Sequence, residues 1–142
     1  MIPEGLNKLR DEIHANAKAK GFYDNEINYA SESSRALEHA FFAQKIALIH
    51  SELSEALEAD RKDNYLSKND IHDLLNKTYQ PNTSSFIVPF VSHIKDTVED
   101  ELADVIIRVL DLCGWLEIDI EKHVELKMKY NETRNYKHGK NY

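Results

Sequence analysis

The sequence TVEDELADVIIRVLDLCGWL at residues 97–116 carries most of the information about the architecture. Its apolar residues point in nearly every direction around a helix axis: Leu102, Val105, Ile106, Ile107, Val109, Leu110, Leu112, Cys113, Trp115 and Leu116. A helix that is apolar on all sides is covered by its neighbours rather than facing water. We therefore expect the central helix of the fold here, with Gly114 marking either its end or a close packing contact.

Apolar residues at helical spacing predict three further helices, over residues 4–20, 35–61 and about 119–134. The second of these contains the run Ile46–Ala47–Leu48–Ile49, which is apolar all round and is expected to be buried. Four main helices in a chain of 142 residues predict an all-α fold, a four-helix-type bundle.

Residues 62–96 have the least regular pattern. A short helical piece is expected near residues 69–77, and the interior prolines Pro81 and Pro89 interrupt the part that follows. We expect one domain, residues 1–142, with an irregular excursion at about 62–96. The excursion is either a lid, which brings Tyr79, Phe86 or Phe90 over a ligand, or plain decoration.

Composition and charge exclude several classes of protein. The net charge of −7, from 25 acids and 18 bases, does not attract a polyanion, so a nucleic acid polymer is not the expected partner. The single cysteine, Cys113, cannot form an intramolecular disulfide. No segment has the apolar length of a signal peptide or a membrane span. A cytoplasmic protein without membrane contact is expected.

Two pairs of carboxylates occur at a spacing that places them on one face of a helix. Glu52 and Glu55 in SELSEALE, and Glu101 and Asp104 in EDELADV, are each separated by three residues. Both pairs adjoin apolar turns, so packing the two helices together would gather four carboxylates in a partly desolvated place. Protons or cations must compensate such a cluster. Hard oxygen ligands suit Mg²⁺, with Mn²⁺ as an alternative. The alternative interpretation is two solvated helix faces.

A polar row near the C-terminus suits an oligophosphate. Lys127, Asn131 and Arg134 continue the line of Ile120 and Val124, so we expect them to point toward the bundle. A cation, an amide and a guanidinium on one row can bind phosphates. The alternative explanation is that basic residues favour the C-terminal end of a helix through its dipole.

These residues resemble a known family. The pairs Glu52-x-x-Glu55 and Glu101-x-x-Asp104, the run KMKYNETR at 127–134 and the run YKHGK at 136–140 are similar to those of the MazG-like all-α nucleoside triphosphate pyrophosphohydrolases. The likeness covers roughly residues 36–60 and 97–140. It implies the all-α NTP pyrophosphatase fold and Mg²⁺-dependent hydrolysis of a canonical or modified (d)NTP to the nucleoside monophosphate and pyrophosphate.

The resemblance also implies roles for the residues. Glu52, Glu55, Glu101 and Asp104 would be the metal ligands, and either Glu52 or Glu55 would orient or deprotonate the attacking water. Lys127, Asn131 and Arg134 would hold the phosphates. The 45 residues between Glu55 and Glu101 are more than compact members of the family have.

Two further expectations concern function and assembly. The alternative function is a non-enzymatic helical module that binds nucleotides or proteins without turnover. A central helix that is apolar all round needs more cover than one chain supplies, and the resemblance implies dimers or tetramers. A homo-dimer or homo-tetramer is therefore expected.

Overall fold

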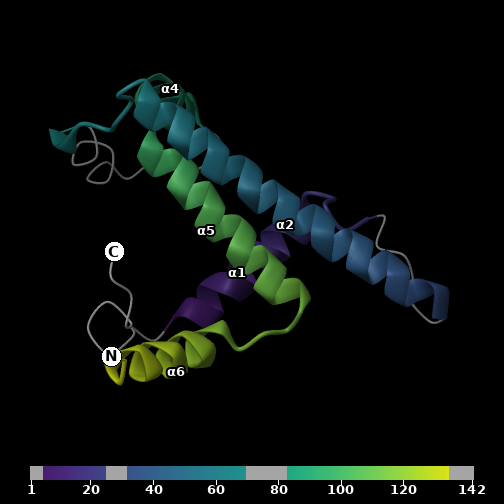
Figure 1. Cartoon of the computed structure of the whole chain (residues 1–142). Coiled ribbons are helices and arrows are strands. Elements are labelled where there is room, and N and C mark those ends of the chain that lie inside the picture. The colour runs from purple at the N-terminus through teal and green to yellow at the C-terminus, as the bar shows by residue number, and fades with distance from the viewer. Residues whose placement is uncertain (1–4, 25–31, 70–82, 135–142) are drawn as a thin grey trace. The chain divides into compact units, whose positions relative to one another are not determined.

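A computed structural model describes residues 5–24, 32–69 and 83–134 of the chain. In these ranges the helices are α1 (Leu6–Ala19), α2 (Glu32–Arg61), α4 (Ser84–His93), α5 (Val98–Trp115) and α6 (Ile120–Glu132) (Figure 1). The described residues contain no β-strand. The all-α prediction is confirmed, and the expected helix near 69–77 and Tyr79 lie almost entirely outside the described residues.

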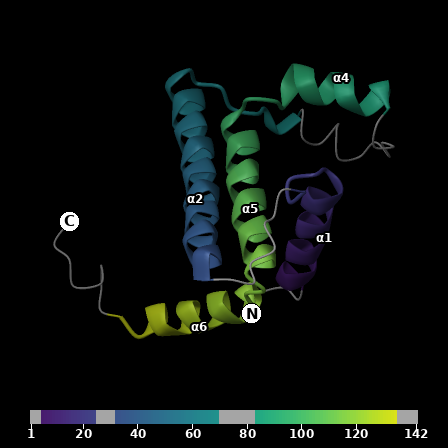
Figure 2. The ribbon, with the colours of Figure 1, turned by 90° about the vertical axis from the view of Figure 1, so that its right-hand side faces the viewer.

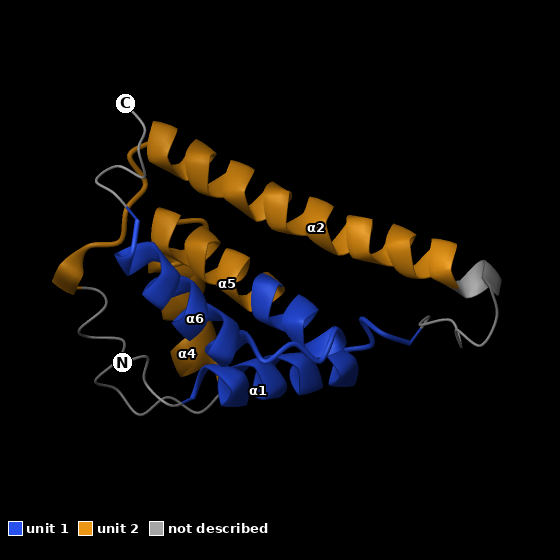
Figure 3. Ribbon diagram, turned by 60° about the horizontal axis from the view of Figure 1, so that its bottom comes forward, with its two compact units in different colours: residues 1–28, 109–142 blue, residues 29–108 orange. Residues whose placement is uncertain are grey.

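The chain divides into two compact units (Figure 3). Unit 1 consists of residues 1–28 and 109–142, and unit 2 consists of residues 29–108. Helix α5 begins in unit 2 and ends in unit 1. We describe each unit by itself, and a single domain over the whole chain stays a prediction.

Three helices end in the same way, with a residue of positive φ directly after the C-cap. These residues are Gly21 after α1 (83°), Asp63 after α2 (53°) and Glu117 after α5 (53°). After α5, for example, Glu117 N donates to Gly114 O and Ile118 N donates to Cys113 O, the two hydrogen bonds of a Schellman motif. Gly21, directly after the C-cap Lys20, therefore stops α1, because glycine adopts a positive φ without strain.

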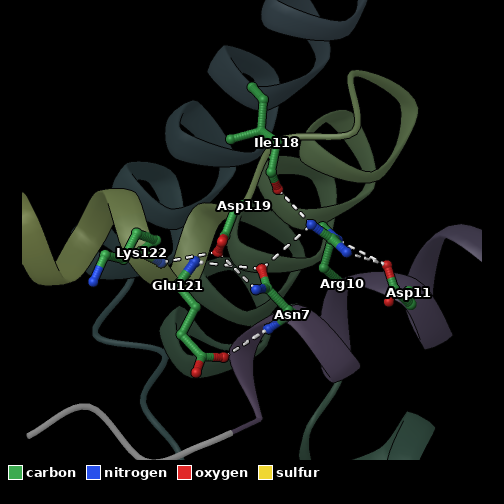
Figure 4. Close-up of polar contacts among 7 residues, drawn as sticks. All are labelled: Asn7, Arg10, Asp11, Ile118, Asp119, Glu121 and Lys122. Atoms are coloured by element: carbon green, nitrogen blue, oxygen red, sulfur yellow. Dashed lines mark hydrogen bonds and ion pairs between the residues drawn. The ribbon is translucent and has the colours of Figure 1, made fainter.

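In unit 1, α1 and α6 contact each other, and each helix satisfies the free N-terminus of the other (Figure 4). Asn7 N donates to the Glu121 carboxylate (3.2 Å), and Asn7 Nδ2 donates to Asp119 Oδ1 (2.7 Å). Asp119 is the N-cap of α6 and accepts from Lys122 N, as expected for the first residue before a helix. The hydrogen bond from Asn7 is the main reason that the pKa of Asp119 lies below its usual value.

A buried carboxylate joins α1 to the end of α5 within unit 1. Asp111 accepts from Tyr23 Oη (2.8 Å) and lies 2.9 Å from His14 Nδ1. Gly114 lies one turn further along, and a Cβ atom built on it would come within 2.6 Å of His14 Cβ. Gly114 therefore marks a close contact between helices, and α5 continues past it to Trp115.

In unit 2, α2 and the first part of α5 lie side by side (Figures 1 and 2). The residues after α2 bind the start of α5: Val98 N donates to Asn64 O, and Leu66 N donates to the Glu99 carboxylate. Together with the ion pair between Glu52 and Arg108, these contacts fix the register of the two helices.

Helix α4 lies in the segment that we expected to be irregular. It is helical from Ser84 to His93 and has Pro89 in its interior. A proline at this position removes one backbone donor from the helix, and the backbone hydrogen bonds at its two ends are present, from Ile87 N to Thr83 O and from Ile94 N to Phe90 O. The excursion therefore includes an ordered helix between α2 and α5.

The expectation that apolar turns are buried is not met within this chain. In the run 46–49, Ala47 and Leu48 are exposed, while Ile46 and Ile49 are half-buried. On α5, Leu102 and Ile106 remain 46% and 56% exposed. None of the helices in the described ranges is long and apolar enough to cross a bilayer.

Candidate metal centre

Three of the four predicted carboxylates come together between α2 and α5. Glu52, Glu55 and Glu101 each offer an oxygen atom, and these three atoms lie within 4.8 Å of one another. Oxygens that share one Mg²⁺ at about 2.1 Å lie about 3 Å apart when adjacent and about 4.2 Å apart when opposite. The three carboxylates thus fit a divalent cation after small side-chain rotations.

The three carboxylates differ in burial and in partners. Glu52 is 6% exposed and accepts a hydrogen bond from Arg108 Nε, while Glu55 is exposed and, among the residues that the structure describes, accepts only from Ser51 Oγ at 3.4 Å. Glu101 is 5% exposed, and its carboxylate receives no hydrogen bond from any residue in the described ranges. No polar side-chain atom in the described ranges is both sealed from solvent and unpaired, so the Glu101 oxygens reach solvent, and a proton or a cation there can compensate their charge.

Burial and neighbouring negative charges raise the pKa of two carboxyl groups in the cluster. Burial is the main cause that raises the pKa of Glu101, and repulsion from Glu55, Asp100 and Glu52 raises it further. The pKa of Asp104 is also raised, mainly by burial and by Asp100, although Arg108 opposes the shift. Both groups therefore hold protons more tightly than usual when no cation is present.

The cluster opens into a cavity of about 450 Å³, a size within the range of ligand pockets. Asp104, the fourth predicted ligand, lines this cavity beside the other three carboxylates. The remaining lining residues are Phe90, Val91, Lys95, Asp96 and Asp100. The cavity thus contains six carboxylates and one lysine, an excess of negative charge that favours cations.

Several of these residues were not predicted from the sequence. Arg108 follows Asp104 by four residues and Glu101 by seven, so its place on the same face of α5 was available from helical periodicity. Lys95 and Asp96 lie in the turn between α4 and α5, where no periodicity exists to place them. Phe90 is one of the aromatic residues that we considered for a lid, and it lines the cavity.

The predicted phosphate-binding row lies in the other unit. Lys127 and Asn131 are on α6 and Arg134 follows it, all three in unit 1 and all exposed. The expected inward orientation of this row is not observed, because the helix presents these long polar groups to solvent. Lys127 and Arg134 lie over the ring of Tyr130, at 5.1 and 6.0 Å from its centroid. Their phosphate-binding role stays a prediction.

Comparison of the chain with models of known families, with curated proteins and with solved structures finds no match.

Proposed function

We propose that this protein is a Mg²⁺-dependent nucleotide pyrophosphohydrolase of the MazG-like kind, with the α2–α5 cavity as its active site. One observation carries the proposal: the Glu101 carboxylate is 5% exposed, has no donor among the described residues, and lies beside Glu52 and Glu55. A purely structural helix pair has no reason to keep such a group, whereas a cation site requires it.

In the proposed reaction, four carboxylates bind the metal and water is the nucleophile. Glu52, Glu55, Glu101 and Asp104 would hold the metal, with Mn²⁺ as an alternative to Mg²⁺. When bound, the metal polarises the phosphoryl group and offsets the charge that develops on it. Water attacks the α-phosphorus, the bond to the β-phosphate oxygen breaks, and a nucleoside monophosphate and pyrophosphate leave.

Glu55 is the better placed of the two α2 carboxylates to orient the attacking water and accept its proton. Arg108 holds Glu52 by an ion pair, while Glu55 is exposed and, among the described residues, has only a weak contact with Ser51. A carboxylate that no ion pair holds can use one oxygen for the metal and the other to accept a proton from water.

The test is incubation with Mg²⁺ and a panel of NTPs and dNTPs, with the products separated by chromatography. We expect a monophosphate and pyrophosphate, and loss of at least about 100-fold in kcat for Glu55→Gln and for Asp104→Asn. Glu132→Gln, an exposed residue at the end of α6, is the matched control for the loss of one charge. A diphosphate with orthophosphate as products, or full turnover in both variants, would refute the proposal.

We also propose that unit 2 associates with a second copy of the chain. Exposed apolar side chains recur on α2 at Phe42, Leu53 and Leu57, spacings that return to one face of a helix, and α5 exposes Leu102 and Ile106. None of the side chains in the described ranges is fully buried, so the core needs cover from outside the chain. Analytical ultracentrifugation should find a dimer or tetramer at micromolar concentration, and a monomer there would refute this.

A further inference from the structure

The cavity at the metal centre has two chemically different walls. Carboxylates from α2 and α5 form one wall, while Phe90 and Val91 of α4 form an apolar part of the other. A cation and phosphates satisfy the first wall but leave the second without a partner. A ligand that fills the whole cavity must therefore carry an apolar or aromatic part next to its charged part.

Helix α4 presents an aromatic surface at this wall. The rings of Phe86 and Phe90 pack against each other with centroids 5.8 Å apart and planes tilted by 33°. Phe90 is only half-buried and lines the cavity, so part of its ring is available to a ligand. Stacking on such a ring is favourable for every nucleobase, because each base has a π-face.

The turn after α4 fixes this surface next to the carboxylates. Lys95 N donates to Phe90 O (3.0 Å), and Asp96 adopts a left-handed conformation with φ of 65°. Asp96 N donates to Asp100 Oδ2, and Asp96 O accepts from Asn64 Nδ2. A non-glycine residue keeps this conformation only where its surroundings enforce it, so the turn is well determined.

The same turn supplies the one cation that lines the cavity among the described residues. Lys95 Nζ forms an exposed ion pair with Asp96, and that hydrogen bond raises the pKa of Lys95. The lysine therefore stays charged at neutral pH. An exposed pair of this kind is weak, so Lys95 can exchange Asp96 for a phosphate group at little cost.

We propose that α4 and the turn after it are the nucleotide-recognition element of the site: the base stacks on Phe90, and Lys95 binds a phosphate. The inference rests on the proposed function for its substrate class, because it assumes that a nucleoside triphosphate occupies the cavity. Phe90 then favours ligands that carry a base, and inorganic tripolyphosphate binds without using it.

The experiment compares two ligands by calorimetry in the presence of Mg²⁺. The first is the α,β-methylene analogue of whichever common dNTP binds most tightly, and the second is inorganic tripolyphosphate, which has no base. Phe90→Ala should weaken binding of the analogue about 10-fold or more and leave tripolyphosphate unchanged. Phe90→Tyr should retain affinity for the analogue, and Lys95→Met should weaken both ligands.

Val88→Ala is the matched control, because Val88 is exposed on α4 and does not line the cavity. Phe90→Leu keeps apolar volume and serves in place of Phe90→Ala if the alanine variant does not fold. Equal affinities for the analogue in the Phe90 variants and in Val88→Ala would refute the inference, as would equal weakening of both ligands, or no binding of the analogue by the wild type.

The design separates this inference from the proposed function, because the analogue is not hydrolysed. If the wild type shows no turnover of any nucleotide but Phe90→Ala still selectively weakens the analogue, the hydrolytic function fails and the recognition element stands. If turnover is found and Phe90→Ala has no selective effect, the hydrolytic function stands and the recognition element fails.

Discussion

Replacing Glu101 by glutamine should raise the thermal stability of the metal-free protein and abolish its stabilisation by Mg²⁺. Glu101 is buried between Glu52 and Glu55, and its carboxylate has no donor among the described residues. The neutral amide of glutamine removes the repulsion, keeps nearly the same volume, and can donate hydrogen bonds to the two remaining carboxylates. The same change removes a charged ligand from the metal centre.

The distances set the size of the effect. Two unit charges 4.8 Å apart repel by about 3.5 kcal/mol at an effective dielectric constant near 20, and by about 0.9 kcal/mol in bulk water. Glu101→Gln removes two such pairs, but Glu55 is exposed and Arg108 neutralises part of the charge of Glu52. We therefore expect a gain of about 1–3 kcal/mol, which corresponds to a rise in Tm of about 3–10 °C.

The pH dependence of stability gives the prediction its sign. The folded protein holds the Glu101 proton more tightly than the unfolded chain, because the pKa is raised in the fold. Glu101 therefore contributes stability that is fully present below its unfolded pKa and is lost as the pH rises through the raised value. In EDTA, the stability of the wild type should fall over that range, and the fall should be shallower in Glu101→Gln.

Thermal melting between pH 4 and 8, in EDTA and in Mg²⁺, measures all of these quantities. Mg²⁺ at about 100 times its Kd should stabilise the wild type by about 2.7 kcal/mol and the variant far less. Glu132→Gln, which removes an exposed charge, should change neither the Tm in EDTA nor the response to Mg²⁺. A lower Tm for Glu101→Gln in EDTA, or an undiminished response to Mg²⁺, would refute the reasoning.

Three other substitutions test separate parts of the structure by urea denaturation. Arg108→Met leaves the buried Glu52 without its partner and should cost about 1–3 kcal/mol, less than for a fully buried pair because the arginine is 39% exposed; Mg²⁺ should recover part of the loss. Gly114→Ala brings a methyl group against His14 Cβ and should cost about 1–3 kcal/mol, and the cost should shrink in a His14→Gly background, which lacks that Cβ, if the clash is its cause. Asp63→Gly should be neutral or stabilising by up to about 1 kcal/mol, because glycine adopts the positive φ without strain, whereas a clear loss would mean that the aspartate side chain matters there.

Helical periodicity predicted most of the elements and three members of the cluster. The spacing of Glu52 and Glu55, and the apolar residues around Glu101, were enough to place these groups between two packed helices. The N-cap role of Asp119 and the positive φ of Gly21 at the end of α1 depend on local chemistry, that is, on a few neighbouring residues. The two helix ends are set by contacts within about one helical turn, whereas the cluster also needs the packing of two helices, which their apolar residues indicated.

Features that depend on packing between distant segments were not predictable in this way. Helix α4 contains a proline and is apolar on several sides, so its pattern does not distinguish a helix from an irregular segment. The place of Phe90 and Lys95 at the cavity follows from the turn at Asp96, which hydrogen bonds from Asn64 and to Asp100 hold in position. Gly114 was ambiguous because only the approach of His14 makes a missing Cβ necessary.

The apolar pattern of α5 predicts burial that the single chain does not provide. Leu102 and Ile106 belong to a helix that is apolar on nearly all sides, yet both are about half exposed in the single chain. Apolar periodicity predicts that a face is removed from water, but it does not say whether the same chain or, as we propose, a second copy covers it. The exposure of Leu102 and Ile106 therefore supports the proposed association with a second copy. Leu102 and Ile106 lie on α5 next to Glu101 and Asp104, which belong to the metal centre. A second copy that covers these two apolar residues would therefore also restrain the metal centre. Dilution below the dissociation constant of the assembly should then lower activity per chain, together with stability.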